Sequence, residues 1–256
     1  MPEQGKHHRN VIFRSNTVPE RAISSLDVPN AIALWKGLEA TCGEGCDFMT
    51  MPHNPNKAWG LMYSRYTWDG QEYNEADWRL RQKREPLAEV FQIKGAQECA
   101  LGVGATDEEC AFEQVLTPCE PGETYGCAFQ TGFVRQGLKV GLELEQEHGF
   151  NPLQTGLIAA TDSHNSNPGD VEEWDFPGAV GAATSSAARR LRETDETRAA
   201  YKTPLKFHTS GGLAAVWAPQ NNREEIFDGL ARRETYATSG PRMAVRFYAG
   251  WGFDET

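Results

Sequence analysis

The stretch Gly156-Leu-Ile-Ala-Ala-Thr-Asp162-Ser-His164-Asn165 is the strongest signal in this chain of 256 residues. Its first five residues are apolar or glycine, as in a short buried strand, and they lead into Asp-x-His. Since residues i and i+2 of a strand point to the same side, Asp162 and His164 can converge on one ion. Carboxylate and imidazole ligands together suit Zn, Mn or Fe. The alternative is an Asp that caps the next turn beside an incidental surface His.

Strand-like and helix-like stretches alternate along the rest of the chain. Runs rich in β-branched or aromatic residues predict strands at 10–13, 48–52, 89–93, 156–160, 214–218 and 244–248, and helical spacing predicts helices at 31–40, 74–84, 130–148 and 223–233. This alternation favours an α/β fold with a parallel sheet or barrel. Active sites of such folds lie beyond the carboxyl ends of strands, where Asp162 and His164 fall.

Three more residues could join this pair. His53 ends a second apolar run, Phe48-Met-Thr-Met-Pro-His53, before a turn, although a lone His is more often structural. Glu89 begins a predicted strand, where an exposed strand-end carboxylate is the plainer reading. His8 precedes the predicted strand at 10–13, at its entrance rather than its exit.

The remaining histidines with a clear sequence context are weaker candidates. His148 ends a charged helical stretch and precedes Gly149, as a residue at a helix C-terminus would. His208 lies in a polar loop from which it could reach a substrate, but no ligand-like partner is near it in sequence.

A polar segment between a predicted helix and a predicted strand offers groups that bind an oxyanion. Thr238 and Ser239 supply hydroxyls, and Arg242 supplies a planar guanidinium. The alternative is a helix end followed by a tight turn.

The six cysteines cluster in loops. Cys42 and Cys46 are four residues apart, and four more crowd a glycine- and glutamate-rich segment at about 97–127. An even, clustered count predicts disulfides in an oxidising compartment, so we expect a periplasmic or secreted protein. We expect a small loop closed by Cys42 and Cys46 and at least one disulfide in the 97–127 segment. We expect this segment to be an insertion on the surface of the domain. The alternatives are free thiols in a cytosolic protein or a zinc site, though no CxxC pair occurs.

The overall composition is that of a globular protein. Hydrophobic residues make up 39% and charged residues 24%, and the formal net charge is −11. This charge repels a phosphate backbone, so nucleic acid is a poor partner. No stretch approaches the roughly 20 apolar residues of a membrane span, and the first residues do not resemble a signal peptide. We expect one domain over residues 1–256.

Four motifs in order carry a family resemblance: HRNVIF, MPHNPN, ATDSHN and RRETYATSGPR. Together they resemble a bacterial family known only as a domain of unknown function, which is similar to the PHP (polymerase and histidinol phosphatase) metallohydrolases. The resemblance implies a distorted (β/α)7 barrel with a di- or trinuclear metal site. It also implies metal-ligand roles for Asp162, His164, His53 and His8.

The sequence departs from the PHP pattern at its start. PHP proteins open with His-x-His on their first strand and add a bridging Glu later, and this sequence contains neither. The chain is therefore expected to be the carboxy-terminal portion of the fold, with the amino-terminal strands missing and the metal site incomplete.

Two functions follow as expectations. The first is metal-dependent hydrolysis of a small phosphate or sulfate ester, with two ions clamping the oxyanion and activating water. Arg242, with Thr238 or Ser239, would steady the ester oxygens. The second is a non-catalytic binding or structural domain whose metal site has decayed.

Overall fold

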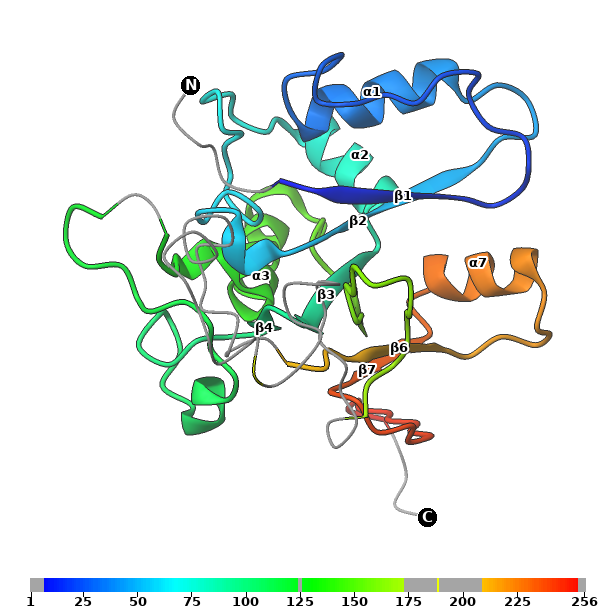
Figure 1. Cartoon of the computed structure of the whole chain (residues 1–256). Coiled ribbons are helices and arrows are strands. Elements are labelled where there is room, and N and C mark those ends of the chain that lie inside the picture. Colours follow the sequence, from blue (N-terminus) through cyan, green and yellow to red (C-terminus); the bar gives the residue numbers. More distant parts are fainter. Residues whose placement is uncertain (1–6, 124–125, 173–187, 189–208, 253–256) are drawn as a thin grey trace.

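A computed structural model describes residues 7–123, 126–172, 188 and 209–252 of the chain (Figure 1). The helices and strands in these residues follow most of the predicted ranges. The strands are β1 (Arg9–Phe13), β2 (Phe48–Pro52), β3 (Leu87–Gln92), β4 (Gly95–Ala96), β5 (Gly156–Ala159), β6 (Leu213–Val216) and β7 (Thr235–Thr238). The α-helices are α1 (Ala31–Thr41), α2 (Glu75–Arg84), α3 (Val134–His148) and α7 (Arg223–Ala231), and short 3-10 turns span Pro55–Lys57, Glu108–Ala111 and Gln130–Gly132.

The described strands form three small sheets. β1 pairs antiparallel with β2, β3 pairs parallel with β5 and antiparallel with β4, and β6 pairs antiparallel with β7. Among the strand pairs of the described residues, β3–β5 is parallel, with α3 between its strands in sequence, and the other three are antiparallel. Closure into a (β/α)7 barrel stays a prediction.

Strand direction decides which residues meet. Because β3 and β5 are parallel, their carboxyl ends lie at the same edge of the sheet. Because β1 is antiparallel to β2, with Arg9 opposite Pro52, the entrance of β1 lies beside the exit of β2. The His53 amide accordingly donates to the His8 carbonyl at 3.0 Å.

Asparagine caps explain why three helices begin where they do. The side chains of Asn30, Asn74 and Asn222 accept from backbone amides in the first turns of α1, α2 and α7. At Asn74 the Asp77 carboxylate also accepts from the Asn74 backbone amide, which completes a capping box. These caps satisfy amides that a helix start leaves without intrahelical partners.

Two predicted ranges need correction. The helix expected at 130–148 is divided, because extended Phe133 separates a 3-10 turn from α3. The strand expected at 244–248 is wrong: this segment is exposed, and the side chains of Tyr236 and Trp217 donate to the carbonyls of Met243 and Val245. Instead, β7 at 235–238 pairs with β6, in a segment expected to be a polar connection between a helix and a strand.

The core contains a buried charged network under aromatic rings. The Glu85 carboxylate accepts from Arg9 Nε at 2.5 Å and from Arg81 Nε at 3.0 Å, and all three side chains are at most 3% exposed. The Arg81 guanidinium lies 5.8–6.0 Å from the ring centroids of four core aromatic residues, Trp35, Tyr63, Tyr73 and Trp78. This network joins β1 to the end of α2.

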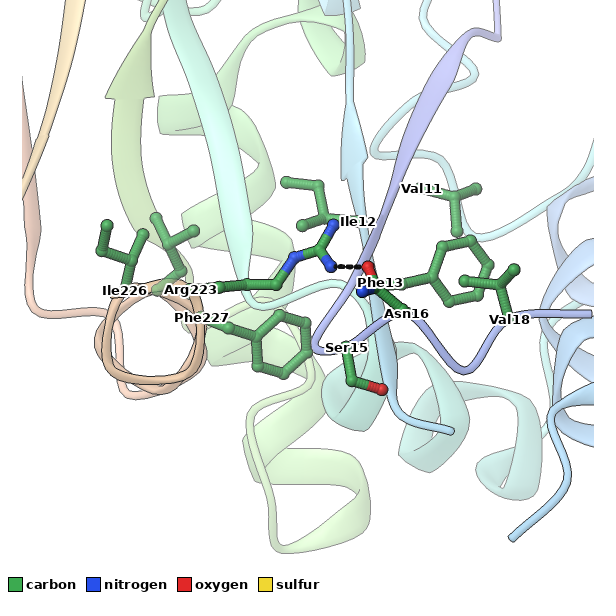
Figure 2. Close-up of a pocket in the computed structure, with 10 residues that line it drawn as sticks. Val11, Ile12, Phe13, Ser15, Asn16, Val18, Arg223, Ile226 and Phe227 are labelled. Atoms are coloured by element: carbon green, nitrogen blue, oxygen red, sulfur yellow. Dashed lines mark hydrogen bonds between the residues drawn. The ribbon is translucent and has the colours of Figure 1, made fainter. Parts of the chain in front are cut away.

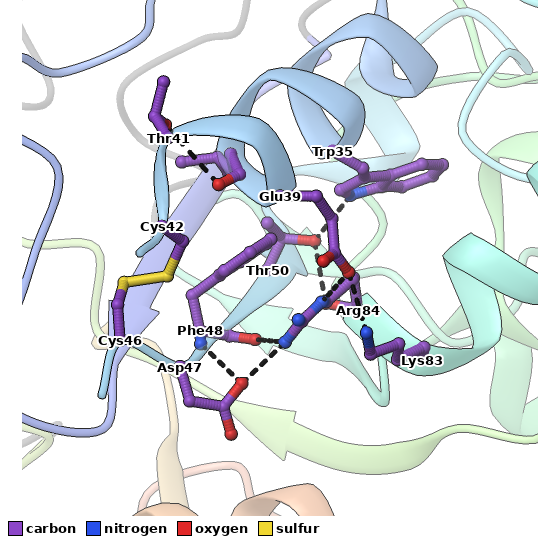
Figure 3. A network of polar contacts seen from close by, with 11 residues as sticks. Trp35, Glu39, Thr41, Cys42, Cys46, Asp47, Phe48, Thr50, Lys83 and Arg84 are labelled. Atoms are coloured by element: carbon purple, nitrogen blue, oxygen red, sulfur yellow. Dashed lines mark hydrogen bonds and ion pairs between the residues drawn. A yellow bond between two sulfur atoms is a disulfide. The ribbon is translucent and has the colours of Figure 1, made fainter. Parts of the chain in front are cut away.

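A second network fixes α1 and α2 against β2 (Figure 3). Arg84 donates to Glu39 on α1 at 2.7 Å, and to Asp47 and the Phe48 carbonyl at 2.7 and 2.8 Å. Thr50 on β2 donates to the Arg84 carbonyl and accepts from the Trp35 indole. Because β2 leads directly into His53, these contacts hold one side of the candidate site.

α7 is attached to Arg14, the residue that follows β1. Arg14 forms a bidentate pair with Asp228, at 2.8 and 2.9 Å. Between the two elements lies a cavity of about 500 Å³, which is lined by Ile226 and Phe227 of α7 and by Ile12 and Phe13 of β1 (Figure 2).

The cysteine prediction is confirmed. Disulfides join Cys42 to Cys46, Cys99 to Cys110 and Cys119 to Cys127. Two of these disulfides lie within the 97–127 segment and cross-link it. None of the helices in the described residues is long and apolar enough to cross a membrane.

Candidate metal centre

The Asp162 carboxylate is the meeting point of the candidate site. Its Oδ1 lies 3.3 Å from Nε2 of His53 and 3.4 Å from Nε2 of His164. Its Oδ2 accepts from the Gln92 amide at 2.9 Å and forms an ion pair with Lys94. Three of the predicted metal ligands are therefore in direct contact.

The Asp-x-His pair converges for a different reason from the one predicted. β5 ends at Ala159, so Asp162 and His164 lie in the following loop and not on one face of a strand. Asp162 has φ +48, a left-handed backbone conformation that is uncommon for residues other than Gly, although Asp adopts it more readily than most. Such strain persists only where surrounding contacts over-determine it, and it is often found at functional sites.

The buried carboxylate of Glu89 contacts the ring nitrogen of His53 that does not face Asp162. His53 Nδ1 lies 3.1 Å from Glu89 Oε2, while Glu89 Oε1 accepts from the Asn54 amide at 3.1 Å. Glu89 is only 1% exposed, so the reading of an exposed strand-end carboxylate is wrong. A histidine that binds a metal usually donates a hydrogen bond from its other ring nitrogen to a carboxylate, a backbone carbonyl or water. With Nδ1 beside Glu89, Nε2 is the His53 atom that would bind the ion.

His8 lies next to His53 through strand pairing. Their rings stack with centroids 6.0 Å apart and an interplanar angle of 14°. At the preceding position in the chain, burial together with Arg9 and His8 lowers the pKa of His7 to about 4.

Gln92 and Lys94 were not predicted as site residues. Gln92 also contacts Asn54, and its side-chain oxygen accepts from the Lys94 amide, so it connects the ends of β2 and β3 with Asp162. The available signal was a strand, AEVFQIK, in which polar residues interrupt an apolar run.

The predicted oxyanion residues lie beside the Asp162 loop. Arg242 donates to Glu172 at 2.9 Å and to the Gly169 carbonyl at 3.0 Å, in the loop that follows His164. Thr238 is buried at the end of β7, whereas Ser239 is exposed. Arg242 is therefore attached to the loop that carries two ligand candidates.

His148 and His208 are the weaker candidates named from the sequence. His148 is the last residue of α3, before a left-handed Gly149, as predicted. His208 lies outside the described residues.

The candidate ligands are of a type that binds divalent ions, and two distances between their ligand atoms match those in a metal site. Zn–N and Zn–O bonds of about 2.0–2.2 Å in a tetrahedral site place ligand atoms about 3.4 Å apart. The separations from Asp162 Oδ1 to His53 Nε2 and His164 Nε2 are 3.3 and 3.4 Å. In the part of the chain that the structure describes, no group of three or more such side chains is already arranged to hold an ion. The Lys94 ammonium is the cation that pairs with Asp162.

Comparison with known proteins identifies a family that matches the whole chain. The family model described as "Protein of unknown function (DUF3604)" matches residues 1–256. No curated protein and no solved structure matches the chain.

Proposed function

The chain belongs to the DUF3604 family, and we propose that it carries the metal centre of a hydrolase that cleaves phosphate esters. The observation that supports this proposal most is the pair of imidazole Nε2 atoms at 3.3 and 3.4 Å from one Asp162 oxygen. The resemblance to PHP metallohydrolases, with the barrel fold, belongs to the same proposal.

The proposed roles follow from the contacts. His53, Asp162 and His164 would hold the ion, and His8, whose ring stacks on that of His53, would contribute to a second one. Glu89 fixes the ring of His53, while Gln92 fixes the Asp162 carboxylate. A bound Mn, Zn or Fe ion would polarise the ester and lower the pKa of water.

The net reaction adds water to a phosphate monoester. The water oxygen forms a bond to phosphorus, the phosphorus–oxygen bond to the organic group breaks, and the leaving oxygen takes a proton to become an alcohol or phenol. Lys94, once Asp162 holds the ion, is a cation able to face the ester oxygens. Arg242, with Thr238 or Ser239, is the second group proposed for this role.

The three disulfides support a place of action outside the cytosol. We therefore propose a periplasmic or secreted hydrolase. A sulfate ester, with the same tetrahedral oxyanion, is the second substrate class in the proposal.

A non-catalytic domain with a decayed metal site is the competing function. The ion pair between Lys94 and Asp162 favours it, because an ammonium group already neutralises the central carboxylate. The two functions differ in whether a divalent ion displaces this contact.

An activity assay separates the two. Aryl phosphate and aryl sulfate esters would be offered with Mn²⁺ or Zn²⁺ to the wild-type chain, to His53→Ala and to His148→Ala. His148 is a matched control because it is the last residue of α3, where its ring contacts Phe150. We expect metal-dependent turnover that His53→Ala removes and His148→Ala keeps. Absence of turnover by the wild-type chain with every ester and metal would reject hydrolysis by this chain.

A further inference from the structure

A cleft of about 590 Å³ opens directly beside the candidate metal centre. His8 and His53 line it on one side, and the start of α1 with Asn30, Ala31 and Leu34 lines it on another. Its volume falls in the usual range for small-molecule sites, about 300–1,000 Å³. An ester held by its oxyanion at the centre would extend its organic group into this space.

Much of the cleft wall is apolar, and it includes two aromatic rings held in place. The Trp68 indole donates to the Pro29 carbonyl and is 40% exposed, so its ring is both oriented and accessible. Tyr73 stacks on Trp78 at a centroid distance of 4.5 Å. Aliphatic side chains complete the apolar surface, at Ile23, Val28, Leu34 and Leu61. Fixed aromatic walls favour a flat apolar ligand, because little side-chain freedom is lost on binding.

The cleft differs from the rest of the molecule in charge. The chain carries a net charge of −11, yet no Asp or Glu is among the described residues that line the cleft. The guanidinium of Arg9, which is also in the lining, pairs with buried Glu85. A charged organic group would leave water without gaining a partner of opposite charge.

We infer that this cleft binds the organic group of the ester, and that this group is uncharged and aromatic. The inference rests on the proposed function for the identity of the anionic end. The preference for an aromatic group can be measured by binding alone, without turnover.

The test compares two non-hydrolysable probes, phenylphosphonate and methylphosphonate. Their affinities would be measured by calorimetry, in the presence of Mn²⁺, on the wild-type chain, Trp68→Ala, Trp68→Phe and Trp251→Ala. Trp251 is a matched control because it is fully exposed and lies outside the cleft. Circular dichroism would establish that each variant is folded.

We expect the wild-type chain to bind phenylphosphonate at least about tenfold more tightly than methylphosphonate. One aromatic contact contributes roughly 0.5–1.5 kcal/mol beyond the area it buries, so Trp68→Ala should reduce this ratio about fivefold. Trp68→Phe should keep most of the ratio, and Trp251→Ala all of it. Equal affinities for the two probes, or an equal loss of both in Trp68→Ala, would overturn the inference.

A third probe, phenol, separates this inference from the proposed function. Phenol carries the ring without the anionic group, and saturation-transfer NMR would report its binding. Phenol binding that depends on Trp68, with no phosphonate binding and no ester turnover, would reject the ester hydrolase and retain the aromatic cleft. Turnover that does not depend on the organic group, with no phenol binding, would retain the hydrolase and reject the cleft.

Discussion

Replacing Glu85 by Gln should destabilise the protein strongly, because the Glu85 carboxylate pairs with two buried guanidinium groups at once. Arg9 and Arg81 donate to it at 2.5 and 3.0 Å, and their side chains are 3% and 1% exposed. The amide of the Glu85→Gln variant would remain able to accept a hydrogen bond, but it would carry no charge to balance the two buried guanidinium groups.

The expected magnitude follows from this geometry. Removing one partner of a buried ion pair costs about 3–5 kcal/mol, and here one substitution affects two pairs. Each kcal/mol moves the unfolding midpoint by about 2–4 °C in a domain of this size, so we expect the midpoint to fall by roughly 6–20 °C. Glu75→Gln, at the start of the helix that Glu85 follows, is the control, since its pair with Arg79 is more than half exposed and contributes about 0–1 kcal/mol.

Thermal unfolding followed by circular dichroism, together with urea titration, would measure both variants. If Glu85→Gln is destabilised no more than Glu75→Gln, the buried network does not hold β1 to α2.

Three further predictions concern the same molecule. Thiol titration of the denatured, unreduced protein after export should find no free thiol, and replacing Cys99 and Cys110 together by Ser should lower stability by about 2–3 kcal/mol, as expected for a short closed loop; six free thiols would contradict this. Burial alone would raise the pKa of Glu85, but Arg9 and Arg81 together hold this pKa below its usual value. The stability that the Glu85 carboxylate contributes is therefore present above about pH 4.5 and is lost as the pH falls through the lowered pKa. Glu85→Gln should accordingly lose less stability in acid than the wild-type chain does, as measured by urea midpoints across pH. Lys94→Met should lower the unfolding midpoint without metal, and saturating Mn²⁺ should restore most of the loss because the ion replaces the ammonium beside Asp162; an equal loss with and without Mn²⁺ would contradict that exchange.

Local patterns in the sequence predicted most of the helices and strands of the described residues. β2 has the predicted limits, because its apolar run ends at a Pro-His-Asn-Pro turn. α1, α2 and α7 begin within one residue of prediction, since asparagine caps are readable in sequence. The strand expected at 244–248 failed because an apolar run becomes a strand only with a partner, and β7 pairs with β6 instead.

The site was predicted in part, and the missing part depends on pairing between distant strands. Glu89 and Gln92 are three residues apart, so strict strand alternation would place them on opposite faces. The register of β3 against β5 shifts between Glu89 and Phe91, and such an irregularity lets both side chains reach the same group of residues. The left-handed backbone at Asp162, which turns the carboxylate toward His53 and His164, has no local sequence signal either.

Metal binding by the Asp162 centre is the measurement that tests this account most directly. Elemental analysis and Mn²⁺ or Zn²⁺ titration would compare the wild-type chain with Asp162→Ala and with Asp170→Ala, a carboxylate in the same loop that accepts from Asn167. We predict that the wild-type chain and Asp170→Ala bind at least one ion, and that Asp162→Ala loses more affinity than the roughly 10–100-fold that loss of an outer-shell partner produces. Equal metal content and affinity in all three proteins would contradict the assignment of Asp162 as the central ligand.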